Sequence, residues 1–208
     1  MMETLDLLRT WTPFLLGGFA VNIGIAILAT AIGTGFGAIL ALLRFSRHRS
    51  VVVAVDAFTS FIRNVPTLVW LFFLATLTPN EINLTEDVVV VFPPWLKASI
   101  ALSASPLGFT SWNLYASVLA WRRDERNAAL LFIPNWLGGF LITLLASSVS
   151  SLVGVSEIVG RCNTIISATG ASHMIPIYLY ASIIFFAFSA ICSAGVAQLK
   201  MALARKIS

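Results

Sequence analysis

The chain has 208 residues, of which only 22 are charged, or 11% where soluble proteins average roughly 25%. Apolar residues make up 58% of the sequence, and the mean hydropathy is +0.91. This leaves too little polar side-chain surface to coat a water-soluble globule of this size. The composition excludes a cytoplasmic enzyme, a secreted disulfide scaffold and a disordered chain, and it predicts an all-α, polytopic helical membrane protein.

Charged and metal-binding residue types give no sign of nucleic-acid binding or catalysis. The net charge is +4, but the basic residues occur singly or in threes without an aromatic-interleaved stripe, so no nucleic-acid partner is expected. Cys162 and Cys192 are thirty positions apart, and His48 and His173 have no partner at ligand spacing, so no metal site is predicted. No phosphate-binding GxxxxGKS/T loop, GxSxG elbow or HExxH motif occurs, and we therefore assign no catalytic residue and expect no enzyme.

Charge-free windows predict the helices that cross the membrane, because the hydrocarbon core requires about 20 apolar residues in succession. The first window, between Arg9 and Arg44, contains 34 residues. We interpret residues 1–208 as a single transmembrane domain with an extracytoplasmic loop at 79–95 and a cytoplasmic loop at 121–128. Five spans are predicted, at approximately 12–43, 57–78, 97–121, 129–152 and 175–199.

The basic residues indicate the direction of each span, since Lys and Arg gather on the cytoplasmic side of membranes. Nine of the thirteen follow the first, third and fifth spans. We therefore expect an extracytoplasmic N-terminus and a cytoplasmic C-terminus. Glu3 and Asp6 accompany a single Arg9 near the start, which is unlike a cleavable signal peptide, so the first span is expected to be retained.

The first span contains three closely spaced glycines. Gly33, Gly35 and Gly37 include one small-xxx-small spacing, which lets two helix backbones approach closely. We interpret this spacing as close packing between helices, with a contact between subunits as the alternative.

The second span is predicted to break near Asn64. Pro66 removes a backbone donor and pushes Val65 away from helical angles. Asp56 and Arg63, seven positions apart, share a helix face, and an ionised Arg at the membrane centre costs about 2.5 to 3.5 kcal/mol. Because such groups are tolerated where protein or a water-filled cavity satisfies them, we assign Arg63, Asn64 and Pro66 to a pathway or gate. Alternatively, Arg63 snorkels to a headgroup and Pro66 merely kinks the span.

A run of small and hydroxyl side chains ends the fourth span. Glu157 and Arg161 follow it at i and i+4 with the acid first, which favours a helical ion pair. The functional interpretation is a gate or the opposing wall of the pathway. The structural alternative is an exposed ion pair on a surface helix that contributes under about 1 kcal/mol. The residues assigned to the wall are Ser147, Ser148, Ser150, Ser151 and Glu157.

Two blocks of the chain resemble a known family in the right order. The segment from Arg63 to Leu74, RNVPTLVWLFFL, resembles the RGTPLLVQLFFL signature of permease subunits of ABC importers for polar amino acids, of the histidine/glutamine/arginine uptake type. Ile133-Pro134 and the segment SSVSSLVGVSEI, which ends at Ile158, are similar to the family's LP and KDTSLVSVIGVSEL blocks. The resemblance runs from about Trp11 to the C-terminus and implies a type I (MetI-like) importer transmembrane domain.

The resemblance also implies partners and a location. A second permease subunit, identical or different, would enclose the path with this chain. Two ATP-binding subunits would bind ATP and Mg, so this chain needs no cofactor of its own. A periplasmic or lipid-anchored solute-binding protein would deliver a polar amino acid or a similar small zwitterion, which ATP-driven alternating access would translocate. The location implied is the bacterial cell (inner) membrane, in contact with lipid.

In this family a cytoplasmic helix with an EAA motif docks into the ATPase. The corresponding loop here is shortened and degenerate: Asn127 replaces the Glu, the downstream Gly is absent, and only four residues separate Ala129 from Pro134. The alternative function is therefore a degenerate, non-transporting membrane partner or assembly subunit that retains the permease fold. The residues assigned to ATPase docking are Arg122, Arg123, Asp124, Glu125, Arg126, Asn127, Ala128 and Ala129.

Overall fold

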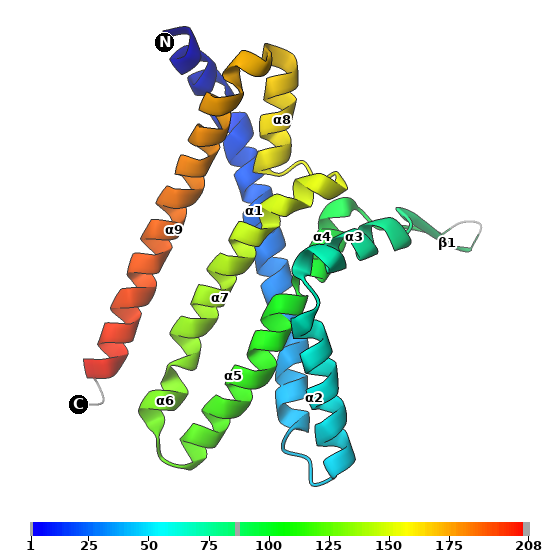
Figure 1. Ribbon diagram of the computed structural model, residues 1–208, viewed down its shortest axis with the longest axis vertical. Helices are drawn as coiled ribbons and strands as arrows, with labels where there is room; N and C mark the ends of the chain where they lie inside the picture. The colour runs from blue at the N-terminus through cyan, green and yellow to red at the C-terminus, as the bar shows by residue number, and fades with distance from the viewer. Residues whose placement is uncertain (1, 86–87, 206–208) are drawn as a thin grey trace.

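The computed structural model describes residues 2–85 and 88–205, which form an elongated bundle of helices with one small β-hairpin (Figure 1). Three helical segments are long and apolar enough to cross a membrane: Thr4–Leu43, Arg126–Val153 and Ala171–Leu203. A fourth span results if the bent pair Arg49–Asn64 and Thr67–Leu77 counts as one. The predicted polytopic helical membrane protein is thus confirmed, whereas the count of five spans stays a prediction.

Helix α1, Met2–Leu43, is the central element of the bundle (Figure 1). Its 42 residues correspond to a length of about 63 Å at 1.5 Å per residue. It packs against α4 (Pro94–Leu102), α5 (Ala104–Arg122) and α7 (Phe132–Ser147), and also against α8 (Ile158–Thr169). Most of the buried apolar side chains lie along these contacts, so α1 organises the core.

The break predicted near Asn64 is confirmed. Helix α2, Arg49–Asn64, ends there, and α3, Thr67–Leu77, leaves at an angle of 90° (Figure 1). Val65 between them has extended backbone angles, φ −80° and ψ 122°, as expected for a residue before proline. Pro66 then forms the N-cap of α3. We call this bend the α2–α3 elbow.

The loop predicted at 79–95 contains an antiparallel hairpin. Strand β1, Glu81–Thr85, pairs with β2, Val88–Val91, with Glu81 opposite Val91. The run of four valines favours a strand because β-branched side chains suit a pleated surface. Within the described residues, this hairpin is the one β-element, where the sequence predicted only a polar loop.

The C-terminal half forms a second layer of long helices beside α1. Helix α5 runs to a tight turn, and α7 returns from it. Helix α8 continues beside the N-terminal half of α1, and α9, Met174–Arg205, runs back along α7 (Figure 1). The C-terminal ends of α1, α5 and α9 lie toward the same end of the molecule, away from the N-terminus (Figure 1). The remaining elements are α6 (Arg126–Leu130) and the 3₁₀ helices η1 (Ser148–Val153) and η2 (Ala171–His173).

Candidate functional site

The α1–α5 crossing depends on glycines that have no room for a side chain. A Cβ on Gly33 would lie 2.5 Å from the carbonyl oxygen of Ser103, and a Cβ on Gly37 would lie 2.7 Å from that of Leu107. Gly35, between them, has nothing within 4 Å. The small-xxx-small spacing therefore mediates close packing within this chain, as interpreted, and the contact it makes is with α5.

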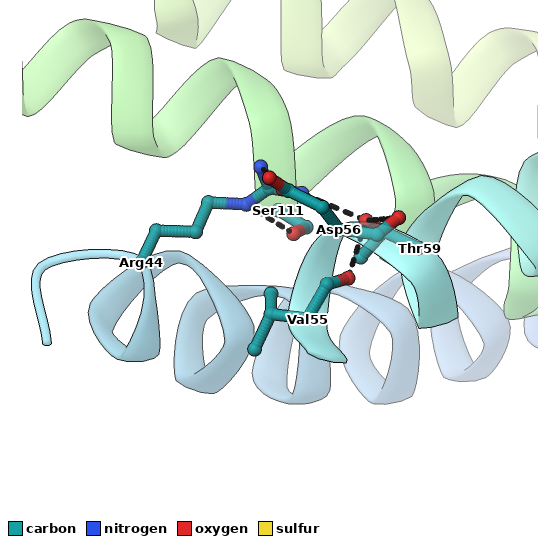
Figure 2. A network of polar contacts seen from close by, with 5 residues as sticks. All are labelled: Arg44, Val55, Asp56, Thr59 and Ser111. Atoms are coloured by element: carbon teal, nitrogen blue, oxygen red, sulfur yellow. Dashed lines mark hydrogen bonds and ion pairs between the residues drawn. The ribbon is translucent and has the colours of Figure 1, made fainter. Parts of the chain in front are cut away.

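Arg44, just after α1, is the centre of a buried polar network (Figure 2). Its Nη1 forms an ion pair with Asp56 of α2, its Nη2 donates to Oγ1 of Thr59 at 2.7 Å, and its Nε donates to Oγ of Ser111 at 3.3 Å. The guanidinium also lies 4.1 Å from the centroid of the Trp112 ring. One side chain thus joins α1, α2 and α5.

This network was not predicted from the sequence, in which Arg44 indicated only the direction of the first span. Asp56 was placed on the same helix face as Arg63, but it pairs with Arg44 instead. One feature of the sequence pointed to the pair. Asp56 is the single acidic residue between Asp6 and Glu81, so it is the one acidic side chain near Arg44 in the sequence that could pair with a buried cation.

Arg63 and Asn64 are exposed at the α2–α3 elbow, and the stem of Arg63 lies against α5. A Cβ on Gly108 would come within 2.5 Å of Arg63 Cγ, so the absence of a side chain at Gly108 makes room for the arginine. Arg63 lines a pocket of about 320 Å³ between the elbow and α5. We call this the elbow pocket. Among the described residues, the guanidinium has no hydrogen-bond or ion-pair partner.

Pro66 lies on the other side of the elbow. It lines a second, mainly apolar pocket of about 270 Å³ together with Leu71, Ala146 and Val149. Val149 lies within the serine-rich run, so this pocket places Pro66 beside that run, although none of the serines assigned to the wall lines it. Arg63 does not take part in it, since its pocket is lined by α5 instead.

Glu157 is completely buried and caps the N-terminus of α8. Its Oε1 accepts from the backbone N–H of Gly160 at 2.9 Å, and its Oε2 accepts from that of Val159 at 3.1 Å. Asn22 of α1 donates its Nδ2 to Glu157 Oε2 and to Ser147 Oγ, both at 2.9 Å. The acid, the amide and the serine therefore form one buried cluster that attaches α8 and the end of α7 to α1.

The predicted ion pair between Glu157 and Arg161 is wrong, and so is the exposed surface pair offered as its alternative. Glu157 is the N-cap, with extended angles φ −88° and ψ −170°, so the i, i+4 geometry of a helix does not apply to its side chain. Arg161 instead donates to the carbonyl oxygen of Phe14 at 2.6 Å and packs over the ring of Phe14. Both residues attach α8 to α1, by separate contacts.

The other serines of the run have different environments. Ser148 is half-buried, donates to the carbonyl oxygen of Leu145 at 2.8 Å and lines a pocket of about 410 Å³ between α7, α8 and α9. Ser151 donates to the carbonyl oxygen of Ser148 at 3.2 Å. Ser150 is fully buried, and its hydroxyl has no partner within the described part of the chain.

The segment assigned to ATPase docking is a short exposed turn between α5 and α7. Asp124 has a positive φ of 62°, and its Oδ1 accepts from Nε of Arg126 at 3.1 Å, with both side chains largely exposed. Ala129 is buried, and its carbonyl oxygen accepts from Ser117 Oγ at 3.1 Å. The turn thus exposes its charged side chains, while Ala129 attaches it to α5 through Ser117. Within residues 2–85 and 88–205, no three His, Cys, Asp or Glu side chains are grouped so that they could hold a metal ion.

Long apolar helices around a buried polar cluster define a multi-pass helical membrane protein. No protein-family model matches the chain. The L-cystine transport system permease protein TcyB of Bacillus subtilis is 26% identical over 198 residues, which cover 86% of this chain and 81% of TcyB. The glutamate/aspartate import permease protein GltK of Escherichia coli is 26% identical over 137 residues, or 64% of this chain, and the match spans only 60% of GltK.

The fold agrees with a solved structure over nearly its whole length. A chain from a crystal structure of an amino acid ABC transporter with histidines has a TM-score of 0.77 and 18% identity, over 93% of this chain and 96% of that one. The arginine transport system permease protein ArtQ of Bacillus subtilis is 25% identical over 118 residues, 57% of this chain and 51% of ArtQ. The chain is thus similar in sequence to amino acid transport permeases and in fold to a chain of an amino acid ABC transporter.

Proposed function

We propose that this chain is a permease subunit of a binding-protein-dependent ABC importer and translocates polar amino acids or related small zwitterions. The observation that carries the proposal is the agreement in fold over 93% of the chain with an amino acid ABC transporter subunit. The permease relatives support the same class. The location would be the bacterial inner membrane.

The assembly would contain a second permease subunit, two ATP-binding subunits and a periplasmic or lipid-anchored solute-binding protein. ATP and Mg would bind the ATP-binding subunits, and hydrolysis there would drive alternating access. The exposed turn from Arg122 to Ala129 is the segment that we expect to contact an ATP-binding subunit. The pocket between Pro66 and Val149 is where we expect gate movement, since the α2–α3 elbow meets the end of α7 there.

The proposed topology has five spans. The first two spans would be α1 and the α2–α3 pair. Helices α4 and α5 together would form the third span, which their length and hydropathy alone do not identify. The segment 126–153 and α9 would complete the set. Basic residues follow the C-terminal ends of α1, α5 and α9, and these three helix ends lie toward one end of the molecule (Figure 1). Because basic residues gather on the cytoplasmic side, this supports an extracytoplasmic N-terminus.

The test is purification through a tag on this chain, followed by identification of the co-purified subunits and measurement of ATP-dependent amino acid uptake in proteoliposomes. The proposal expects an ATP-binding subunit in the complex and uptake that requires ATP. A complex without an ATP-binding subunit would contradict it.

The shortened docking turn favours the second candidate, a non-transporting partner. Under that function Arg63→Ala leaves uptake by the assembly unchanged, whereas the importer function expects uptake to collapse.

A further inference from the structure

The elbow pocket contains one cation and no acid. Arg63 is the single charged side chain among its ten lining residues, which also include Thr67, Ser105 and Asn113. Its volume of about 320 Å³ falls within the range of roughly 300 to 1,000 Å³ that small-molecule sites occupy. The pocket is therefore large enough for a small solute, and its charge selects an anionic group.

The guanidinium of Arg63 has open donors, unlike the two arginines that join helices of the bundle. Arg44 donates to Asp56, Thr59 and Ser111, and Arg161 donates to the backbone of Phe14. Arg63 has no hydrogen-bond partner within the described ranges, and Gly108 leaves room for its stem. A planar guanidinium carries five N–H donors in a fork that matches the two oxygens of a carboxylate.

Further groups around the pocket match the rest of an amino acid. Thr67 and Ser105 line the pocket, and their hydroxyls make no hydrogen bond to the described residues, so they are available to donate. Asn113 uses its Nδ2 on the carbonyl oxygen of Phe109 at 2.9 Å, which leaves Oδ1 as an acceptor for an ammonium group. Donors and an acceptor that line the same pocket as the cation suit a zwitterion better than a simple anion.

We propose that the elbow pocket binds the α-carboxylate of the transported amino acid through Arg63, an assignment that rests on the proposed function. The α-ammonium group then faces Asn113. Because Arg63 and Thr67 belong to the two helices of the elbow, a carboxylate held here contacts the bend itself and α5 together. Solute binding and the angle of the elbow are thereby coupled.

The test follows the accessibility of a cysteine in the pocket. Ser105→Cys is made in the full chain together with Cys162→Ala and Cys192→Ala, and its reaction rate with N-ethylmaleimide is measured in native membranes. An equimolar mixture of the protein amino acids without cysteine, whose thiol would consume the reagent, is expected to slow the reaction about tenfold or more. The corresponding decarboxylated amines, such as agmatine, are expected to slow it less than about twofold, because they lack the group that Arg63 binds.

Variants assign the protection to Arg63. Arg63→Gln is expected to abolish protection, whereas Arg63→Lys, which keeps the charge without the fork, is expected to retain part of it. Gly108→Ala displaces the Arg63 stem and is expected to weaken protection, while Gly138→Ala, with nothing within 4 Å of its Cβ, is the matched control. An unchanged reaction rate in the absence of amino acids shows that a variant has folded.

Three results would overturn the assignment. They are no protection by the amino acid mixture, equal protection by the amines, and undiminished protection in Arg63→Gln. A lipid phosphate is the other source of an anion, so the purified protein is also tested in nanodiscs of phosphatidylcholine with and without phosphatidylglycerol. Slowing by the anionic lipid alone would likewise overturn it. Because the labelling requires neither ATP nor transport, it is independent of the co-purification experiment that tests the proposed function.

Discussion

Asn22 and Glu157 are hydrogen-bonded at 2.9 Å although 135 positions separate them in the sequence, and neither side chain is exposed. The carboxylate caps α8, and the amide oxygen of Asn22 also accepts from the backbone N–H of Ile158 at 3.1 Å. A single amide on α1 thus satisfies both an acid and a free donor at the start of α8. Glu157 therefore anchors the start of α8 to α1.

Replacing Asn22 with Ala is expected to destabilise the fold. The change leaves a buried carboxylate and a buried backbone donor each without one partner, which costs about 1 to 3 kcal/mol per group. The measurement is the thermal unfolding midpoint of the purified protein. Asn135→Ala is the matched control, because Asn135 is exposed and its side chain makes no hydrogen bond to the described residues. Equal midpoints for the two variants would show that the buried cluster contributes no stability.

Alanine at the α1–α5 crossing is expected to have opposite effects at neighbouring glycines. Gly33→Ala places a methyl group against the backbone of α5, and overpacking of this kind costs about 1 to 3 kcal/mol. Gly35→Ala meets nothing within 4 Å and is expected to be neutral or slightly stabilising, because alanine favours helix more than glycine does. Thermal unfolding of the two variants side by side gives the comparison. A loss of stability in Gly35→Ala equal to that in Gly33→Ala would contradict the packing argument.

Local sequence rules predicted the features that depend on neighbouring residues. The break at the α2–α3 elbow follows from steric restriction before Pro66, and the close α1–α5 crossing follows from the spacing of Gly33 and Gly37. Contacts between distant segments could not be derived this way. The i, i+4 rule failed for Glu157 because it holds only when both residues are helical, and Gly154, with φ 83°, shows that the chain has left the helix before that point.

The Arg44–Asp56 pair was outside the reach of sequence rules for a similar reason. Twelve positions separate the residues, and the turn between α1 and α2 brings them together (Figure 2). Only the scarcity of acids in this part of the chain pointed to a partner. The hairpin was missed because the loop at 79–95 was assessed by polarity, although its four consecutive valines favour a strand.

Arg44 is expected to be essential to the packing of α1, α2 and α5. Arg44→Met leaves Thr59 and Ser111 buried without the guanidinium, and each lost charged hydrogen bond is worth about 1.5 to 3 kcal/mol. Asp56→Asn is expected to cost less, because 46% of the Asp56 side chain is exposed and water can replace the pair. A double-mutant cycle by chemical denaturation measures the coupling. A larger loss from Asp56→Asn than from Arg44→Met would contradict a network centred on the arginine.

The exposed turn between α5 and α7 offers a charge-reversal test of subunit docking. Arg126→Glu removes an exposed pair with Asp124 and a contact with the exposed ring of Trp121, so the unfolding midpoint of the isolated chain is expected to change little. If this turn contacts an ATP-binding subunit, reversing its charge is expected to reduce the amount of that subunit that co-purifies, and to do so more at low salt than at high salt. Lys200→Glu, at an exposed position on α9, is the control for a change in overall charge. Equal losses in the two variants would point to a general electrostatic effect, and full retention in Arg126→Glu would place the contact elsewhere.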